Sequence, residues 1–134
     1  MNGYLMFEKE WVPGEDLFEQ SHSPENSYGV VLEFDGETLY FYALDRSAQE
    51  GGMGILDALF IWQRQEEPDK LPVKLQLFWS QDWQKCALVI DGKCHAIFDF
   101  ASHGGYNVSE FPPPNSIWTR GDRKLTDEII QQLF

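Results

Sequence analysis

Four ionisable side chains could perform acid–base chemistry if the fold brought them together: Asp57, His95, Asp99 and His103. A histidine changes its charge near neutral pH, and a neighbouring carboxylate can orient the ring or exchange a proton with a substrate. The four residues come from an apolar segment around residue 57 and from a hairpin and loop between residues 93 and 103. They would have to meet in a pocket roofed by the loop of residues 101–118. A small-molecule enzyme or sensor with such a pocket is one of two functions that the sequence allows.

The spacing of these residues argues against a metal ion, a cofactor and a catalytic triad. His95 and Asp99 lie four positions apart on an expected strand, about 13 Å at ~3.3 Å per residue, which is too far to ligate one ion. Ser102 and His103 are neighbours in sequence, whereas the members of a triad come from separate segments. The glycine-rich residues 51–54 lack the Lys-Ser/Thr pair of a phosphate-binding loop. We therefore expect no metal and no cofactor, and His95 is then a hydrogen-bonded structural residue.

The loop of residues 102–114 combines glycines and prolines with aromatic side chains. Tyr106, Phe111 and the nearby Trp118 could form a rigid, exposed platform for a protein partner, because rings on a preset backbone lose little entropy on binding. They could equally pack over the end of a sheet as a lid to the core. The sequence leaves both roles open.

The charge of the chain is concentrated in its first half. The net charge is −12, and residues 1–69 contain 15 acidic and 3 basic side chains, whereas residues 70–134 contain 7 of each. Such a field attracts a cationic partner and repels nucleic acid and anionic membranes. If it is an interaction surface, Glu33, Glu37, Asp45 and Glu50 should lie on one side of the fold. An acidic face can also serve solubility alone.

These observations favour a non-enzymatic, acidic binding protein over an enzyme. The size of the chain, the absence of a catalytic constellation in its sequence and the acidic half together suggest an inhibitor or immunity-type partner of a basic protein.

Two hairpins are predicted from Asp-Gly turns. Residues 28–34 and 37–43 are rich in β-formers and flank Asp35-Gly36, and residues 86–90 and 93–100 flank Asp91-Gly92. Residues 73–79 alternate as a further strand. In the second hairpin this register pairs Cys86 with Ile97 and Cys94 with Val89, so the two thiols should face opposite sides and remain unbridged.

Two helices complete the predicted fold. Residues 55–65 lack strand alternation and carry Ile55, Leu59 and Trp62 at helical spacing, with Asp57 in the first turn, where it suits the helix dipole. Thr126 is expected to cap a C-terminal amphipathic helix. The polar residues 18–27 are expected to form a surface loop. The fold class is therefore predicted as α+β, with an antiparallel sheet built from two or more hairpins, one central helix and one C-terminal helix.

Length and composition indicate one domain over residues 1–134. The longest apolar run, residues 58–62, is too short to cross a bilayer, and no leader pattern precedes it, so we expect a cytoplasmic protein. The following residues are expected in the core: Leu32, Leu39, Phe41, Leu59, Leu88 and Ile97.

Residues 55–61, 88–100 and 111–114 resemble a family of small uncharacterised bacterial proteins, a domain of unknown function. The resemblance extends roughly over residues 28–118. Its clearest parts are the His-Ala-x-Phe-Asp-Phe strand that ends at Phe100 and the later Gly-Tyr and Phe-Pro-Pro. It implies a bacterial source and a stand-alone domain, and it carries over no activity.

Overall fold

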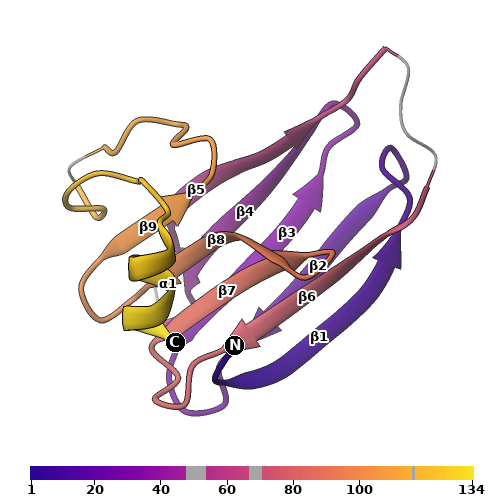
Figure 1. Ribbon diagram of the computed structural model, residues 1–134. Coiled ribbons are helices and arrows are strands. Elements are labelled where there is room, and N and C mark those ends of the chain that lie inside the picture. The colour runs from indigo at the N-terminus through magenta and orange to yellow at the C-terminus, as the bar shows by residue number, and fades with distance from the viewer. Residues whose placement is uncertain (48–53, 67–70, 116) are drawn as a thin grey trace.

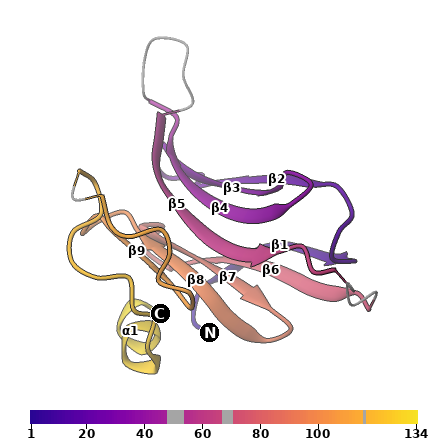
Figure 2. The same ribbon diagram turned by 90° about the horizontal axis from the view of Figure 1, so that it is seen from above.

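The computed structural model describes residues 1–47, 54–66, 71–115 and 117–134, and within them nine strands form two antiparallel sheets. Sheet A has the strand order β1-β6-β7-β8-β9, and sheet B has the order β2-β3-β4-β5. The sheets lie face to face, and the helix α1 lies on the outer side of sheet A (Figures 1 and 2). The elements are β1 (Tyr4–Trp11), β2 (Leu17–His22), β3 (Tyr28–Phe34), β4 (Thr38–Asp45), β5 (Gly54–Gln63), β6 (Val73–Trp79), β7 (Lys85–Ile90), β8 (Lys93–Asp99), β9 (Gly104–Asn107) and α1 (Asp127–Leu133).

The core fills the space between the two sheets. Successive side chains of a strand point to opposite faces, so each strand sends alternate residues inward. Phe41 of sheet B and Phe98 of sheet A meet there with ring centroids 4.9 Å apart. The indole N–H of Trp79 donates to the Ser21 hydroxyl across the same space, at 2.9 Å. The six residues predicted to be buried are all fully buried: Leu32, Leu39, Phe41, Leu59 and Leu88 lie in this core, whereas Ile97 is buried on the outer face of sheet A.

The central helix predicted over residues 55–65 is wrong, because this segment contains strand β5, which pairs with β4. Two β-bulges interrupt that pairing, and they leave Leu56 and Ile61 without a partner on β4. An extra residue shifts every later side chain by one position. The inward residues Leu59 and Trp62 are consequently three apart instead of two, and this spacing imitates a helical one.

Strand β2 was not predicted, because its sequence is mostly polar. The surface loop predicted over residues 18–27 contains most of β2, which pairs with β3 along its whole length. Its inward residues Leu17 and Ser21 are buried. The predicted α+β class is therefore wrong, and the protein is a nearly all-β sandwich with a C-terminal helix. Residues 51–53 of the glycine-rich segment lie outside the described residues.

Both Asp-Gly turns form the predicted hairpins. Phe34 pairs with Leu39, two residues further along β4 than a two-residue turn would give. A shift of two residues keeps every side chain on its predicted face. In the second hairpin Asp91 and Gly92 have φ of 48° and 80°, as a type I′ turn requires.

The two cysteines are free and lie on opposite sides of sheet A, as predicted. Cys86 belongs to the core between the sheets and pairs with Phe98, one residue beyond the expected Ile97, because β8 has a bulge. Cys94 pairs with Val89 and lines an outer groove. Burial raises the pKa of Cys86, and it raises the pKa of Cys94 to about 11. Both thiols therefore stay protonated at neutral pH.

The C-terminal helix begins as predicted. The Thr126 hydroxyl accepts from the Ile129 N–H at 3.1 Å, and Asp127 and Glu128 occupy the first turn. In the described part of the chain, no helix has the length and apolar character needed to cross a membrane.

The different burial of two side chains on β5 allows a direct test of this strand assignment. Leu59 is fully buried, whereas Ile55 on the same strand is 57% exposed. We expect Leu59→Ala to lower the free energy of unfolding by about 2–5 kcal/mol, through lost burial and a residual cavity. Denaturant unfolding measures this loss, with Ile55→Ala as the matched control that should change little. A loss below about 1 kcal/mol at Leu59 would contradict the assignment of this residue to the core.

The turn between β6 and β7 is organised by Asp82. Its carboxylate accepts from the Ser80 hydroxyl at 2.6 Å, the Lys85 ammonium at 2.7 Å and the Gln84 N–H at 3.0 Å. Burial alone would raise the pKa of Asp82, but the hydrogen bonds from Lys85, Ser80 and Gln84 outweigh it and hold the pKa at about 2. The ionised carboxylate thus stabilises the folded turn.

This depressed pKa predicts a pH dependence of stability. An unfolded aspartate has a pKa of about 3.9, so the contribution is complete above that value and is lost as the pH falls through the folded-state pKa. We expect Asp82→Asn to lower the free energy of unfolding at neutral pH, and the difference from wild type to shrink on acidification toward about pH 2. Denaturant unfolding across this pH range measures the difference, with the exposed Asp16→Asn as control. A difference that stays constant on acidification would contradict the assignment.

Candidate functional site

Asp57, the first of the candidate acid–base residues, forms a buried ion pair with Arg123. The guanidinium donates from Nη1 to Oδ2 at 2.7 Å and from Nη2 to Oδ1 at 2.8 Å. The exposed fractions of the two side chains are 2% for Asp57 and 1% for Arg123. The Thr119 hydroxyl also donates to the carboxylate. A carboxylate paired in this bidentate way has a structural role, because its lone pairs are already engaged.

This ion pair joins the two sheets at one edge. Asp57 lies on β5, the edge strand of sheet B, and β5 contacts β9, the edge strand of sheet A. Arg123 also donates to the backbone carbonyls of Gly105 on β9 and Pro112 in the following loop. A Cβ at Gly105 would stand 2.6 Å from Asp57 Oδ2 and 2.9 Å from Arg123 Nη1. The close approach of the two edges therefore requires glycine at position 105.

Asn107 extends the same connection. Its side-chain amide donates to the carbonyls of Phe60 at 2.8 Å and Phe111 at 2.9 Å. The Phe60 N–H in turn donates to the Phe111 carbonyl at 3.0 Å. The chain after β9 thus lies beside β5 and satisfies the backbone N–H and carbonyl of Phe60.

The other three candidate acid–base residues have separate contacts. The buried carboxylate of Asp99 accepts from the hydroxyl and N–H of Ser102 in its own turn. His103 stacks on Trp118, with centroids 5.1 Å apart, and His95 Nδ1 lies 2.9 Å from the Lys93 carbonyl oxygen. Within the described residues, no hydrogen bond joins any two of Asp57, His95, Asp99 and His103.

A cavity of about 340 Å³ lies between β5 and residues 112–115 of the loop after β9. It is bordered by Asp57, Arg123, Pro112 and Pro113. Of the four candidate acid–base residues only Asp57 lines it, and the Asp57 carboxylate is engaged by Arg123 and Thr119. This cavity therefore presents no free acid or base.

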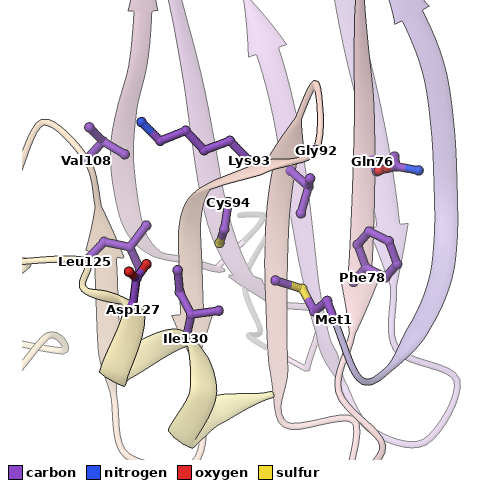
Figure 3. A pocket seen from close by; sticks show the side chains of 11 residues that line it. Met1, Gln76, Phe78, Gly92, Lys93, Cys94, Val108, Leu125, Asp127 and Ile130 are labelled. Carbon is purple, nitrogen blue, oxygen red and sulfur yellow. The ribbon is translucent and has the colours of Figure 1, made fainter.

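A wider groove of about 700 Å³ lies between α1 and the outer face of sheet A (Figure 3). Cys94 lies in the middle of it, Phe78 lies on one side, and Leu125 and Ile130 lie on the other. Lys93 and Asp127 contribute opposite charges to the lining, so the groove has no one-sided field. The Cys94 thiol stays protonated at neutral pH and is not a ready nucleophile.

The three aromatic residues predicted as a platform occupy three different places. Trp118 is 8% exposed and packs against Phe98 and Phe100, so it acts as a lid to the core. Tyr106 lies on β9 in sheet A, where burial and the charges of neighbouring acidic residues raise its pKa. Phe111 is 51% exposed and contacts Phe60 of sheet B.

The acidic residues predicted to share one side lie on β3 and β4 or in the turn between them, except Glu50, which lies outside the described residues. Glu33 lies on β3, and Glu37 lies in the turn that precedes β4. Asp45 ends β4, about 24 Å from its beginning at ~3.4 Å per residue. Hydrogen bonds from the hydroxyls of Ser27 and Ser47 lower the pKa of Asp45. Glu33 and Glu37 are therefore near one end of the sheet, and Asp45 is engaged locally at the other.

The outer face of sheet B carries a row of aromatic residues with Glu33 among them. Cross-strand pairing aligns four residues, one from each strand, and Phe111 extends the line beyond β5. We call this set the aromatic row: Phe18, Glu33, Tyr40, Phe60 and Phe111.

Three rings of the aromatic row are in contact, and the rings at both ends are partly accessible. Tyr40 and Phe60 meet edge to face with centroids 6.0 Å apart, and Phe60 and Phe111 meet similarly at 6.2 Å. Phe18, at the other end, is 51% exposed. In the described residues, no hydrogen bond or ion pair engages the Glu33 carboxylate. Burial and then the charge of Glu33 raise the pKa of the adjacent Tyr42. The row thus presents an unpaired carboxylate between aromatic rings.

A smaller pocket, the sandwich-end pocket, opens between the sheets. It has a volume of about 230 Å³ and is lined by Trp11, Leu39, Ile61, Trp62, Ile90 and His95, among others. Its lining is mostly apolar. The described residues contain no cluster of three or more His, Cys, Asp or Glu that could hold a metal ion.

The fold defines a two-layer β-sandwich protein. Residues 11–134 match DUF2251, whose description is an uncharacterized protein conserved in bacteria, so the chain belongs to this bacterial family. An uncharacterized protein of Haemophilus influenzae is 38% identical over 108 residues, which cover 78% of this chain and 65% of that protein. The chain thus spans just under two thirds of the length of this relative. No solved structure matches the chain significantly.

Sequence reasoning found some of these residues and missed others. Asp57 was identified because it is the one charge in an apolar segment, but its partner Arg123, 66 residues away, stands among charged neighbours and gives no local signal. Phe60 was assigned to the predicted helix over residues 55–65. Phe18 was assigned to a loop.

The buried ion pair predicts a large and coupled effect on stability. We expect Arg123→Met alone to lower the free energy of unfolding by about 3–5 kcal/mol, because it leaves the Asp57 carboxylate buried and uncompensated. The double variant Asp57→Asn/Arg123→Met should cost less than the sum of the two single variants. Denaturant unfolding of the four proteins measures the coupling.

The exposed ion pair Lys9–Glu19 is the matched control for this double-mutant comparison. Its Nζ–Oε1 distance is 3.1 Å, but the side chains are 44% and 29% exposed, so its coupling should be at most about 1 kcal/mol. Equal coupling in the two cycles would show that the Asp57–Arg123 pair has no special role.

Proposed function

We propose that this protein is a non-enzymatic binding protein that recognises a basic protein partner through the outer face of sheet B. An inhibitor or immunity-type protein is a role of this kind. The observation that carries the proposal is the unpaired Glu33 carboxylate between the rings of Phe18 and Tyr40 in the aromatic row.

The chemistry of the aromatic row suits a cationic side chain, above all arginine. A guanidinium can pair with a carboxylate in a bidentate manner and stack on an aromatic ring at the same time. Such an anchor in a ring-lined site is the usual form of an interface hot spot. A partner that presents one or more arginines would therefore find both contacts in the row.

The overall charge supports the same kind of partner. A net charge of −12 raises the encounter rate with a basic surface and disfavours nucleic acid and anionic lipid. The acidic excess lies in residues 1–69, the half of the chain that contains all four strands of sheet B. The long-range attraction of a basic partner and its contact with the aromatic row would thus both involve the first half of the chain.

A small-molecule enzyme or sensor is the second candidate function. One observation favours it, namely that His95 lines the sandwich-end pocket. The remaining residues of the predicted catalytic group, Asp57, Asp99 and His103, are engaged by their own neighbours. Small-molecule binding without catalysis is the form of this alternative that the contacts support.

A direct test uses an arginine-rich peptide as probe and NMR chemical shifts as the readout. We expect saturable shifts at Tyr40, Tyr42 and Phe60, and Glu33→Gln should weaken the affinity by about tenfold, the effect of ~1.4 kcal/mol. Glu128→Gln is the matched control, because it removes the same charge from exposed α1. Added salt should weaken binding to both variants.

Two outcomes would contradict the proposal. Equal losses for Glu33→Gln and Glu128→Gln would mean that only net charge attracts the peptide. Shifts confined to sheet A would place the binding surface elsewhere.

A further inference from the structure

Two β-bulges, one in each sheet, flank the sandwich-end pocket. In sheet B, Leu39 pairs with Trp62 and Tyr40 with Phe60, so Ile61 has no partner on β4. In sheet A, Val89 pairs with Cys94 and Leu88 with Ala96, so His95 has no partner on β7. Bulges redirect a side chain, and they are over-represented beside functional sites. Both bulged residues, Ile61 and His95, line this one pocket.

The backbone and ring of His95 are held in place. Its carbonyl accepts from the Val108 N–H at 3.1 Å, and its Nδ1 lies 2.9 Å from the Lys93 carbonyl oxygen. A carbonyl oxygen can only accept, so Nδ1 carries the hydrogen in this contact. In the neutral ring the other nitrogen, Nε2, is then an acceptor.

The rest of the lining is mostly apolar. Trp11 and Trp62 meet edge to face with centroids 5.6 Å apart, and the indole N–H of Trp11 is engaged by the Glu15 carbonyl at 2.9 Å. The other polar residue of the lining, Gln65, donates from its amide nitrogen to the Gln63 carbonyl. Its remaining oxygen, like His95 Nε2, is an acceptor. The volume of about 230 Å³ exceeds the ~150 Å³ of an apolar cavity known to hold benzene.

We propose that the sandwich-end pocket binds a small aromatic molecule that carries a hydrogen-bond donor. The ring packs between Ile61 and the two tryptophans, and the donor reaches the imidazole of His95. Few, well-placed polar groups in an apolar pocket are the usual arrangement for recognising a small ligand. This site lies between the sheets and is independent of the aromatic row on the outer face of sheet B.

The proposal is tested with phenol and toluene, which have the same shape but differ in the hydrogen-bond donor. The full chain is titrated with each compound, and the indole N–H signals of Trp11 and Trp62 are followed by NMR. We expect saturable shifts with phenol, with a Kd on the order of 1 mM or below, and an affinity for toluene at least about fivefold weaker.

Variants identify the site and the role of His95. His95→Phe keeps an aromatic ring without the acceptor and should remove the preference for phenol over toluene, whereas the exposed His22→Phe should leave it unchanged. Ile61→Phe should fill the pocket and weaken both ligands. Thermal unfolding checks that each variant is folded.

Three results would overturn the proposal. They are the absence of saturable shifts at the two indoles, equal affinity for phenol and toluene in the wild type, and an unchanged phenol preference in a folded His95→Phe variant.

Discussion

The buried pair of Asp57 and Arg123 determines how this sandwich is closed. A two-sheet sandwich leaves edge strands with unpaired backbone groups, and such edges invite pairing with other chains. Here β5 and β9, the edges of different sheets, approach each other, and the chain after β9 lies along β5. The guanidinium of Arg123 anchors that chain by contacts to Asp57, Gly105 and Pro112. A charged pair is tolerated there because nearly every lone pair and N–H around it is engaged.

The outer faces of the two sheets differ in how far they are covered. The outer face of sheet A is partly covered by α1, and its residues Ala87 and Ile97 are fully buried. The outer face of sheet B has no covering element among the described residues, and it carries the aromatic row with two rings about half exposed. Exposed rings around a carboxylate are unusual for a purely solvating surface, which explains why this face is the best candidate for partner recognition.

Part of this fold could be predicted from short turn and helix-cap motifs in the sequence. The Asp-Gly turns at residues 35–36 and 91–92 specify hairpins, with positive φ at Gly36 and at both Asp91 and Gly92, and Thr126 specifies a helix start. The strand β5 was mispredicted because bulges at Leu56 and Ile61 remove the alternation that identifies a strand. β2 was missed because its polar residues do not show that one face is buried.

The candidate site was less predictable than the fold, because it depends on contacts between distant segments. The sequence indicated Glu33 through the acidic excess and Phe111 through the aromatic loop, but not that cross-strand register places Phe18, Tyr40 and Phe60 in line with them. It grouped His95 with Asp57, whereas a bulge turns His95 into a different pocket. Register and bulges are set by the packing of whole sheets, which no local pattern reveals.

The central claim is that the outer face of sheet B is the recognition surface, and site-specific photo-crosslinking in a bacterial cell that contains the partner tests it most directly. The crosslinking residue is placed at Phe18 in sheet B or, as a control, at Leu5 in sheet A, since these side chains are 51% and 46% exposed. The account predicts a crosslink to a basic protein from position 18 that Glu33→Lys abolishes, and none to that protein from position 5. A crosslink to the same protein from position 5 alone, or one from position 18 that Glu33→Lys leaves unchanged, would contradict it.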